Sequence, residues 1–255
     1  LRTAVPVAGL AARVSSGRRL HAASAVRACD ATAAGAREIV VHAADIPASD
    51  RHGTWEPRAD ATAADGVSLA SPDLGWAATS APLAQPRDYV DVRVTPEAGT
   101  PYRVWLRLKA SGDSKWNDSV WLQFSHARVD GATAFGINST SGLAVNLEPC
   151  AACGTAGWGW RDGAYWITST RVTFDAGVQT IRIQTREDGV IFDQLVLSSG
   201  TYLAQAPGQS MGDGTILPRS GTTGPAPATA STPYGGTPVR LPGVVQAEQF
   251  DEGGE

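Results

Sequence analysis

TIRIQTREDGVIFDQLVLS, at residues 180–198, is the stretch of sequence on which the fold depends. The Asp188-Gly189 dipeptide in its middle tolerates the positive φ angles of a two-residue hairpin loop, so the stretch predicts two strands joined there. In the second strand Ile191, Leu195 and Leu197 share one face with Asp193, while Val190, Phe192 and Val196 share the other. A strand that is apolar on both faces is covered on both sides. We therefore expect this hairpin at the middle of a β-sandwich.

Short alternating segments precede the hairpin. In 89–95, for example, Val90, Val92 and Val94 share one face. The strands that we expect, in order, are 38–46, 66–70, 74–77, 89–95, 102–110, 119–125, 164–168 and 171–175. Strands of this length, separated by Gly, Pro and Asp and accompanied by no helix-period segment, predict an all-β fold: an antiparallel jelly-roll β-sandwich.

The texture of the chain changes on both sides of this region. Residues 1–37 are rich in Arg and Ala and are expected to be a leader outside the folded domain, which we place at 38–203. Residues 204–240 are rich in Gly, Pro, Ser and Thr and predict a linker. The last stretch, 241–255, contains VVQA, which echoes VVHA at 40–43. We expect it to open a second, related module, so that further modules are covalently linked.

Composition narrows the class of partner. The 255 residues carry a net charge of −4, which argues against nucleic acid or anionic membrane as a partner. No apolar run of about 18 residues is present to span a bilayer. Eight Trp accompany a single Met. Trp in such excess packs a β core or forms stacking surfaces.

The chain has three cysteines, Cys29, Cys150 and Cys153. The Cys-Ala-Ala-Cys at 150–153 cannot hold zinc alone, because no second pair or histidine cluster follows it. A small loop disulfide between Cys150 and Cys153 and free thiols are the two alternatives, and the disulfide would leave Cys29 unpaired.

Several aromatic residues stand in loops without a core pattern. Trp158 and Trp160 lie in a Gly-rich loop, and Trp116 precedes Asn117 in a polar one. An exposed indole covers the C–H face of a sugar while amides and carboxylates bind the hydroxyls. Trp105 and Trp121 are expected to pack between sheets or line a sheet face, and Trp55 and Trp76 to pack.

The segments YRVWLRLKA, KWNDSVWLQFS, GWGWRDGAYW and REDGVIFDQLVLS resemble the galactose-binding-like jelly-roll group of carbohydrate-binding modules, families 6 and 35. The terminal VVQAEQFDEGGE resembles the opening of a family 6 module. The resemblance implies a sugar site in loops at one end of the sandwich. The polar position falls at Glu187 or Asp188, and the aromatic positions fall among Trp116, Trp158, Trp160, Tyr165 and Trp166. We expect these loops and Asn117 to converge near Asp188.

The resemblance also implies a structural calcium bound by the first and last strands, although no cofactor is required. Asp193 matches the last-strand position, and Gln246 and Glu248 match first-strand positions in the second module. His42 and Ala44 stand at those positions in the first module, which departs from the pattern. On its strand face Asp193 needs a partner, and an arginine, backbone amides and a metal are the alternatives.

These observations favour a non-catalytic carbohydrate-binding module that tethers a larger secreted or cell-surface protein to polysaccharide. The alternatives are a glycoside hydrolase domain and a structural spacer. Hydrolysis needs two carboxylates about 5–10 Å apart across a cleft. Glu187 and Asp188 are sequence neighbours whose side chains diverge on an extended strand, so we expect no enzyme activity from this stretch.

Overall fold

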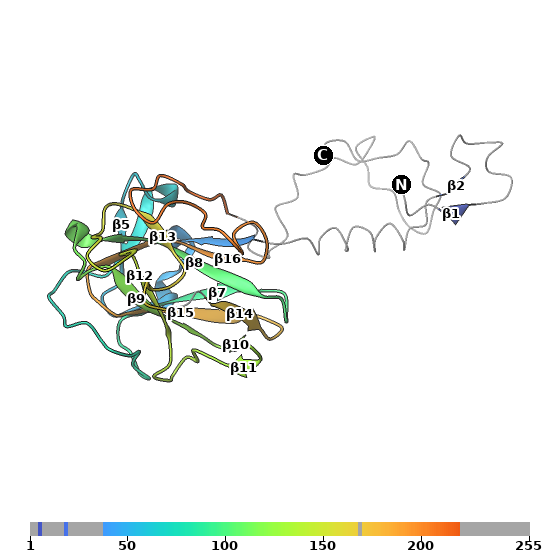
Figure 1. Cartoon of the computed structure of the whole chain (residues 1–255), viewed down its shortest axis with the longest axis horizontal. Helices are drawn as coiled ribbons and strands as arrows, with labels where there is room; N and C mark the ends of the chain where they lie inside the picture. The colour runs from blue at the N-terminus through green and yellow to red at the C-terminus, as the bar shows by residue number, and fades with distance from the viewer. Residues whose placement is uncertain (1–4, 7–17, 20–37, 168–169, 220–255) are drawn as a thin grey trace.

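The computed structural model describes residues 5–6, 18–19, 38–167 and 170–219, and within these ranges the domain is a sandwich of two antiparallel sheets (Figure 1). The larger sheet has the strand order β11 (Ala132–Thr133), β10 (Ala127–Val129), β14 (Arg171–Phe174), β8 (Tyr102–Ala110), β16 (Val190–Ser198), β6 (Val67–Ala70) and β5 (Glu56–Ala59). In the same sheet β13 (Gly159–Arg161) pairs with β8, and β3 (Glu38–His42) pairs with β16.

The smaller sheet has the order β12 (Leu143–Asn146), β9 (Ser119–Phe124), β15 (Gln179–Thr185), β7 (Tyr89–Val94) and β4 (Arg51–His52). Single turns of 3-10 helix connect strands at η2 (Ala43–Asp45), η3 (Ala48–Asp50), η4 (Ala64–Gly66) and η5 (Ser111–Asp113). Apart from the domain, β1 (Val5–Pro6) pairs with β2 (Arg18–Arg19). In the part of the chain that is described, no helix is long and apolar enough to cross a membrane.

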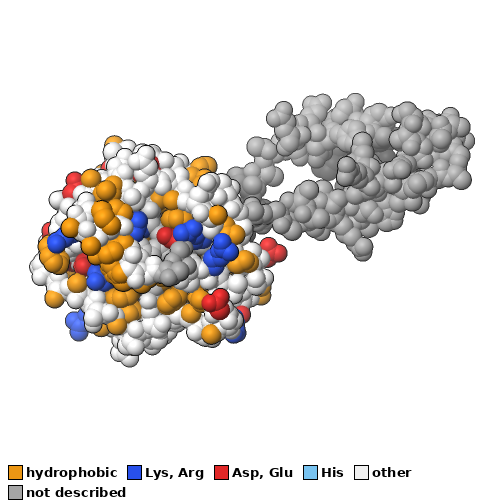
Figure 2. Space-filling model, viewed as in Figure 1, with side chains coloured by type: hydrophobic (Ala, Val, Ile, Leu, Met, Phe, Trp, Pro, Cys, Tyr) orange, Lys and Arg blue, Asp and Glu red, His pale blue; other side chains and the backbone are white. Residues whose placement is uncertain are grey.

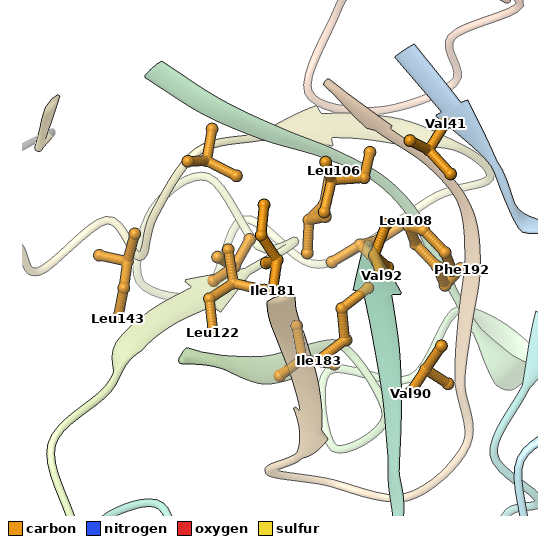
Figure 3. Close-up of a cluster of buried hydrophobic side chains, with 14 of the residues drawn as sticks. Val41, Val90, Val92, Leu106, Leu108, Leu122, Leu143, Ile181, Ile183 and Phe192 are labelled. Atoms are coloured by element: carbon orange, nitrogen blue, oxygen red, sulfur yellow. The ribbon is translucent and has the colours of Figure 1, made fainter. Parts of the chain in front are cut away.

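The core lies between the two sheets. Alternate residues of β7 and β15, such as Val92 and Ile183, point toward Leu106, Leu108 and Phe192 of the larger sheet (Figure 3). In β7 and β15 the two-residue periodicity of the sequence therefore predicts correctly which side chains point into the core.

The stretch expected to be a hairpin is instead an arch between the two sheets. β15 pairs with β7 and β9 in the smaller sheet, whereas β16 pairs with β3, β6 and β8 in the larger one. Gly189 does have a positive φ, 73°, but the corner that it forms carries the chain across the sandwich. The prediction of a hairpin is wrong because a turn signal says where the chain bends and not which strands pair.

β16 also contains a bulge. Phe192 lies opposite Leu108 and Gln194 opposite Arg107, so Asp193 is one extra residue in the strand. An extra residue reverses the alternation of faces. Val190 and Phe192 consequently point into the same core as Leu195 and Leu197, and the expected grouping of faces is wrong across position 193.

Two expected strands are absent. Residues 74–77 form a loop, and the backbone N–H groups of Leu74 and Trp76 donate to the Asp188 carboxylate instead of to a neighbouring strand. Residues 164–167 form a turn closed by a bond from Ile167 N to Ala164 O, with Tyr165 and Trp166 at the surface. In both segments the large apolar side chains are exposed on a loop and do not pack in a sheet.

The folded domain extends beyond residue 203. We call residues 202–219 the C-terminal strap; it is drawn in orange after β16 and loops back over the larger sheet (Figure 1). The Leu217 side chain is buried with four others on the outer face of this sheet: Val40, Trp105, Trp160 and Val196. Leu217 N and O both bond the Gln194 side chain, at 3.1 and 2.7 Å.

The linker expected from residue 204 therefore does not begin before residue 220. The segment has few apolar residues, but one of them, Leu217, anchors it together with the hydrogen bonds to Gln194. Residues 220–255, with Gln246 and Glu248 of the expected second module, lie outside the described part of the chain, as does most of the expected leader.

If the strap is part of the fold, removing its anchor destabilises the whole domain. We expect Leu217→Ala to lower the free energy of unfolding by about 2 kcal/mol, because it deletes a buried side chain and leaves a cavity. Chemical denaturation of the full chain measures the change. The neighbouring Ile216 is exposed and Ile216→Ala is the matched control. Equal effects of the two substitutions would show that the strap does not contribute to stability.

Candidate functional site

Large exposed apolar side chains gather on three loops. Of the nine in the described residues, seven belong to the segments 71–88, 111–118 and 162–167: Leu74, Trp76, Leu83, Trp116, Tyr165, Trp166 and Ile167. Hydrophobic and basic side chains lie next to one another over the visible face of the domain (Figure 2). An apolar patch that stays exposed on a folded domain marks an interaction site. Hydrogen bonds from buried side chains hold these loops in place.

Asp188 organises the first loop from beneath. Its Oδ2 accepts hydrogen bonds from Leu74 N at 2.6 Å and from Trp76 N at 3.0 Å, and the side chain is buried. Gly189 N donates to Pro72 O at 3.2 Å. Asp188 therefore supports the first loop, and the ligand contact that the resemblance implies for it stays a prediction.

Asn117 supports the second loop in the same way. Its Nδ2 donates to Asp73 Oδ2 at 2.9 Å and to Ser111 O at 3.1 Å, and it packs so closely on Gly189 that a Cβ at position 189 would lie 2.6 Å from its Cγ. The neighbouring Trp116 points outward, with 67% of its surface exposed. The expected pair thus splits into a buried amide and an exposed ring.

Glu187 belongs to a buried cluster of acids. Its Oε2 accepts from Ser119 Oγ at 2.6 Å and its Oε1 accepts from Arg186 Nη1 at 2.6 Å. Asp118 lies beside it and accepts from Asn146 Nδ2 at 2.6 Å and from Glu148 N at 3.0 Å. Burial, together with repulsion from the Glu187 carboxylate, raises the pKa of Asp118 to about 8. Like Asp188, Glu187 is turned inward.

Arg186 is the polar centre of the exposed surface. Its guanidinium carbon lies 5.6 Å from the centre of the Trp166 ring and 5.8 Å from that of Trp121. Trp121 Nε1 donates to Thr79 Oγ1 at 2.9 Å, and Thr79 N donates to Arg186 O at 3.0 Å. The guanidinium thus lies near two indoles, and its buried Nε–H has no partner in the described chain.

A cavity of about 260 Å³ opens beside this guanidinium. Trp76 and Thr79 line one wall and Gln184, Arg186 and Asp188 the other. On the far side of Arg186, Tyr165 meets Trp166 edge to face with ring centres 4.7 Å apart. We call the surface formed by Trp76, Thr79, Tyr165, Trp166 and Arg186 the Arg186 surface.

Trp158 and Trp160, expected as exposed stacking residues, are buried, with 4% and 1% of their surfaces exposed. Trp160 packs under the strap, and its Nε1 donates to Thr215 O at 3.2 Å. Trp158 Nε1 donates to Thr62 Oγ1 at 2.8 Å. The glycine between them permits this cover, because a Cβ on Gly159 would overlap the backbone of Ser210. The expectation fails because the covering segment lies fifty residues later in the chain.

Trp105 and Trp121 do not share a face. They lie on strands of opposite sheets and cover separate outer surfaces, and both are buried. Trp121 is nevertheless adjacent to the Arg186 surface. Trp76, which was expected to pack in a strand, is exposed and lines the cavity.

Arg186 and Thr79 carried no signal that singled them out in the sequence. Only the structure shows that the Arg186 guanidinium contacts both the buried Glu187 carboxylate and the exposed Trp166 ring.

Asp193 has an arginine and a backbone amide as partners, two of the three alternatives that the sequence leaves open. Its Oδ1 accepts from Ala64 N at 2.8 Å, and its Oδ2 accepts from Arg107 Nη1. Burial raises the pKa of the Asp193 carboxyl, and the bonds from Arg107 and Ala64 oppose that rise by favouring the charged form. Across the described residues no three His, Cys, Asp or Glu side chains form a group suited to a metal ion.

Cys150 and Cys153 form a disulfide that closes the loop after β12, with Cα atoms 5.3 Å apart. The same loop is tied to the acid cluster, since Gly154 N donates to Glu148 Oε1 at 3.0 Å. The disulfide therefore braces the cluster and lies outside the Arg186 surface.

The raised pKa of Asp118 predicts a pH-dependent stability. A carboxyl whose pKa rises from 3.8 in the unfolded chain to about 8 in the fold stabilises the fold fully below pH 4, and this contribution is lost as the pH rises to about 8. We expect Asp118→Asn, which stays neutral, to remove this slope. Denaturation midpoints of both proteins from pH 4 to pH 8 measure it, with Asp175→Asn at an exposed carboxylate as the control. Parallel profiles of the parent and Asp118→Asn would contradict the assignment.

No protein-family model matches the chain, and no curated protein matches it significantly. Among solved structures it is similar to the isomalto-dextranase of Arthrobacter globiformis complexed with panose, at 15% identity and a TM-score of 0.40 over 63% of this chain and 23% of that one. It spans less than a third of that enzyme.

Two isolated modules also align with it. One is the C-terminal CBM6 of a marine laminarinase from Zobellia galactanivorans, at 9% identity and a TM-score of 0.37 over 64% of this chain and 99% of that one. The other is a family 35 carbohydrate-binding module from Clostridium thermocellum, at 15% identity and a TM-score of 0.32 over 62% of this chain and 97% of that one. With likenesses this distant, the function has to be inferred from the site itself.

Proposed function

We propose that this domain binds a polysaccharide or oligosaccharide at the Arg186 surface. The observation that carries the proposal is the grouping of exposed rings around a guanidinium beside a cavity: Trp76 lines the cavity with Arg186, and the exposed Trp166 ring lies 5.6 Å from the Arg186 guanidinium carbon. The sequence resemblance to modules of families 6 and 35 supports it independently.

The chemistry of the surface suits a sugar. A pyranose has apolar C–H faces, which an indole covers, and a rim of hydroxyls that accept hydrogen bonds from a guanidinium. The cavity of about 260 Å³ is smaller than the ~300–1,000 Å³ that is typical of sites enclosing a whole ligand. We therefore expect one sugar unit to enter it while neighbouring units lie over Trp166 and Tyr165.

Binding without catalysis is favoured by the carboxylates. Hydrolysis by the usual route needs two of them, facing each other about 5–10 Å apart across an open cleft. Glu187 and Asp188 are both buried and both accept hydrogen bonds that fix neighbouring loops. Asp88 and Asp188 line the cavity, but both accept hydrogen bonds from backbone N–H groups of neighbouring loops, which supports a scaffold role for them.

The domain's role would be to attach a larger protein to its polysaccharide. The disulfide between Cys150 and Cys153 fits an oxidising environment, which supports a secreted or cell-surface location. In that setting the domain would supply binding and other, covalently linked modules would supply any chemistry.

The ring substitutions test the site. We expect Trp166→Ala to weaken polysaccharide binding by about 2 kcal/mol, roughly thirtyfold, because a stacking ring at the centre of a site is lost. Trp76→Ala should weaken it comparably by opening the cavity wall. Affinity electrophoresis through gels containing different polysaccharides measures retention, and an assay for released reducing sugars on the same panel detects catalysis.

Val178→Ala is the control, since Val178 is an exposed apolar residue that directly precedes β15, at the end of the strand away from Arg186. Trp116→Ala reports whether the site extends to the second loop. If folded Trp166→Ala and Trp76→Ala are retained as strongly as the parent, the Arg186 surface is not the site. Sugar release by the parent would show that the domain is catalytic.

A further inference from the structure

The Asp193 carboxylate meets a positive charge that the chain itself supplies. Arg107, on the adjacent strand β8, donates from Nη1 to Asp193 Oδ2, and both side chains are almost wholly buried. The same guanidinium donates from Nη1 to Thr62 O at 3.2 Å and from Nη2 to Asp213 O at 3.0 Å. One carboxylate and two main-chain carbonyl oxygens therefore converge on one fixed cation.

The surroundings of this cation are closed. The Arg107 guanidinium carbon lies 4.7 Å from the centre of the buried Trp158 ring, whose face stabilises a desolvated cation. Asp213, whose carbonyl it binds, is itself held in place, because its carboxylate accepts from Gln209 N at 2.6 Å and from Thr215 N at 2.7 Å. Arg107 thus ties the strap to the larger sheet.

The resemblance to family 6 modules implies a structural calcium at this position, and the residues present do not fit one. Calcium takes about six to eight oxygen ligands. Here both Asp193 oxygens accept from N–H donors, and a guanidinium already carries the positive charge. The first-strand residue is His42, whose ring nitrogens contact Asp65 Oδ2 at 2.7 Å and Leu217 O at 2.9 Å.

The remaining acids nearby are also paired. Arg219, at the end of the strap, donates from Nε to Asp45 Oδ2 at 2.7 Å and from Nη2 to Asp65 Oδ2 at 2.6 Å. A calcium ion at Asp193 would have either to displace Arg107 or to bury a second positive charge beside it, at a large electrostatic cost.

We propose that Arg107 takes the place of the structural calcium, so that a cation of the chain itself holds the domain together. The guanidinium joins three segments far apart in the sequence: the bulge of β16 at Asp193, the turn at Thr62 and the strap at Asp213. It uses the same kinds of oxygen that a calcium ion would use. The domain consequently folds and keeps its stability without the metal, whatever ligand the Arg186 surface binds.

The first test needs no substitution. The full chain is melted in excess EDTA and in millimolar calcium chloride, and unfolding is followed by near-UV circular dichroism. We expect the same melting temperature in both. A higher melting temperature in calcium, or a lower one in EDTA, overturns the proposal.

The second test removes the cation. Breaking a buried ion pair from one side costs ~3–5 kcal/mol, so Arg107→Gln should lower the melting temperature by roughly 10 °C. Arg103→Gln is the matched control, because Arg103 lies on the same strand, pairs with Asp162 and lies 4.5 Å from the Trp105 ring, but its pair is partly exposed. A partly exposed pair is worth ~1 kcal/mol or less, and this control should lose no more than about 4 °C.

If Arg107→Gln melts no lower than Arg103→Gln, Arg107 does not have the structural role assigned to it. Should Arg107→Gln fail to fold, Arg107→Lys replaces it and is compared with Arg103→Lys. Lysine keeps the charge but cannot bind three oxygens in the geometry of the guanidinium. The proposal then requires the larger loss at position 107.

Discussion

β16 is buried on both of its faces, by the smaller sheet on one side and by the strap on the other. Its residues on one side, Phe192 and Leu195 among them, fill the core between the sheets, while Val196 on the other side packs under the strap. Burial of apolar surface is worth ~25 cal/mol per Å², so an uncovered outer face would leave much of that stabilisation unused. The strap covers this outer face. It carries little apolar surface of its own, but Leu217 and the bonds to Gln194 place that surface over the strand.

The position of the candidate site follows from the arch that joins β15 to β16. Where the chain leaves one sheet for the other, its backbone N–H groups lose their strand partners and need others. Asp188 and Glu187 accept from the backbone N–H groups of Leu74 and Asp118, and Asn117 Nδ2 donates to the Ser111 carbonyl oxygen. Once these polar side chains are committed to the scaffold, the loops that they hold present mainly rings and one arginine to the outside. A rigid support of this kind is what a stacking site requires, since a ring that is already in place loses little entropy on binding.

The sequence predicts the fold class because alternation is a local property. The burial of Val90, Val92, Ile181 and Ile183 follows from a period of two, whichever strands happen to pair. Pairing itself is not local: the Asp188-Gly189 turn has the composition of a hairpin, and only the partners of β15 and β16 show that it is an arch. Whether a later segment of the chain covers a side chain is not a local property either. Trp158 and Trp160 have the setting of exposed loop aromatics until Ser210 and Leu217 are brought over them, whereas Trp116, Tyr165 and Trp166 in similar loops receive no cover and stay exposed. The bulge at Asp193 explains the remaining error, since one extra residue reverses every later face.

The two arginine clusters of this domain are built from the same parts. Arg107 lies against Trp158 and binds Asp193; Arg186 lies near Trp121 and Trp166 and binds Glu187. The two clusters differ in whether a later segment of the chain covers the arginine. The strap closes over Arg107 and supplies the Asp213 carbonyl, so both terminal nitrogens of this guanidinium bond within the fold. No described segment closes over Arg186 in the same way, and it lines a cavity together with Trp76 and Thr79. An arginine beside an indole is therefore structural or available to a ligand according to whether the chain returns to cover it, and here it returns over only one of the two.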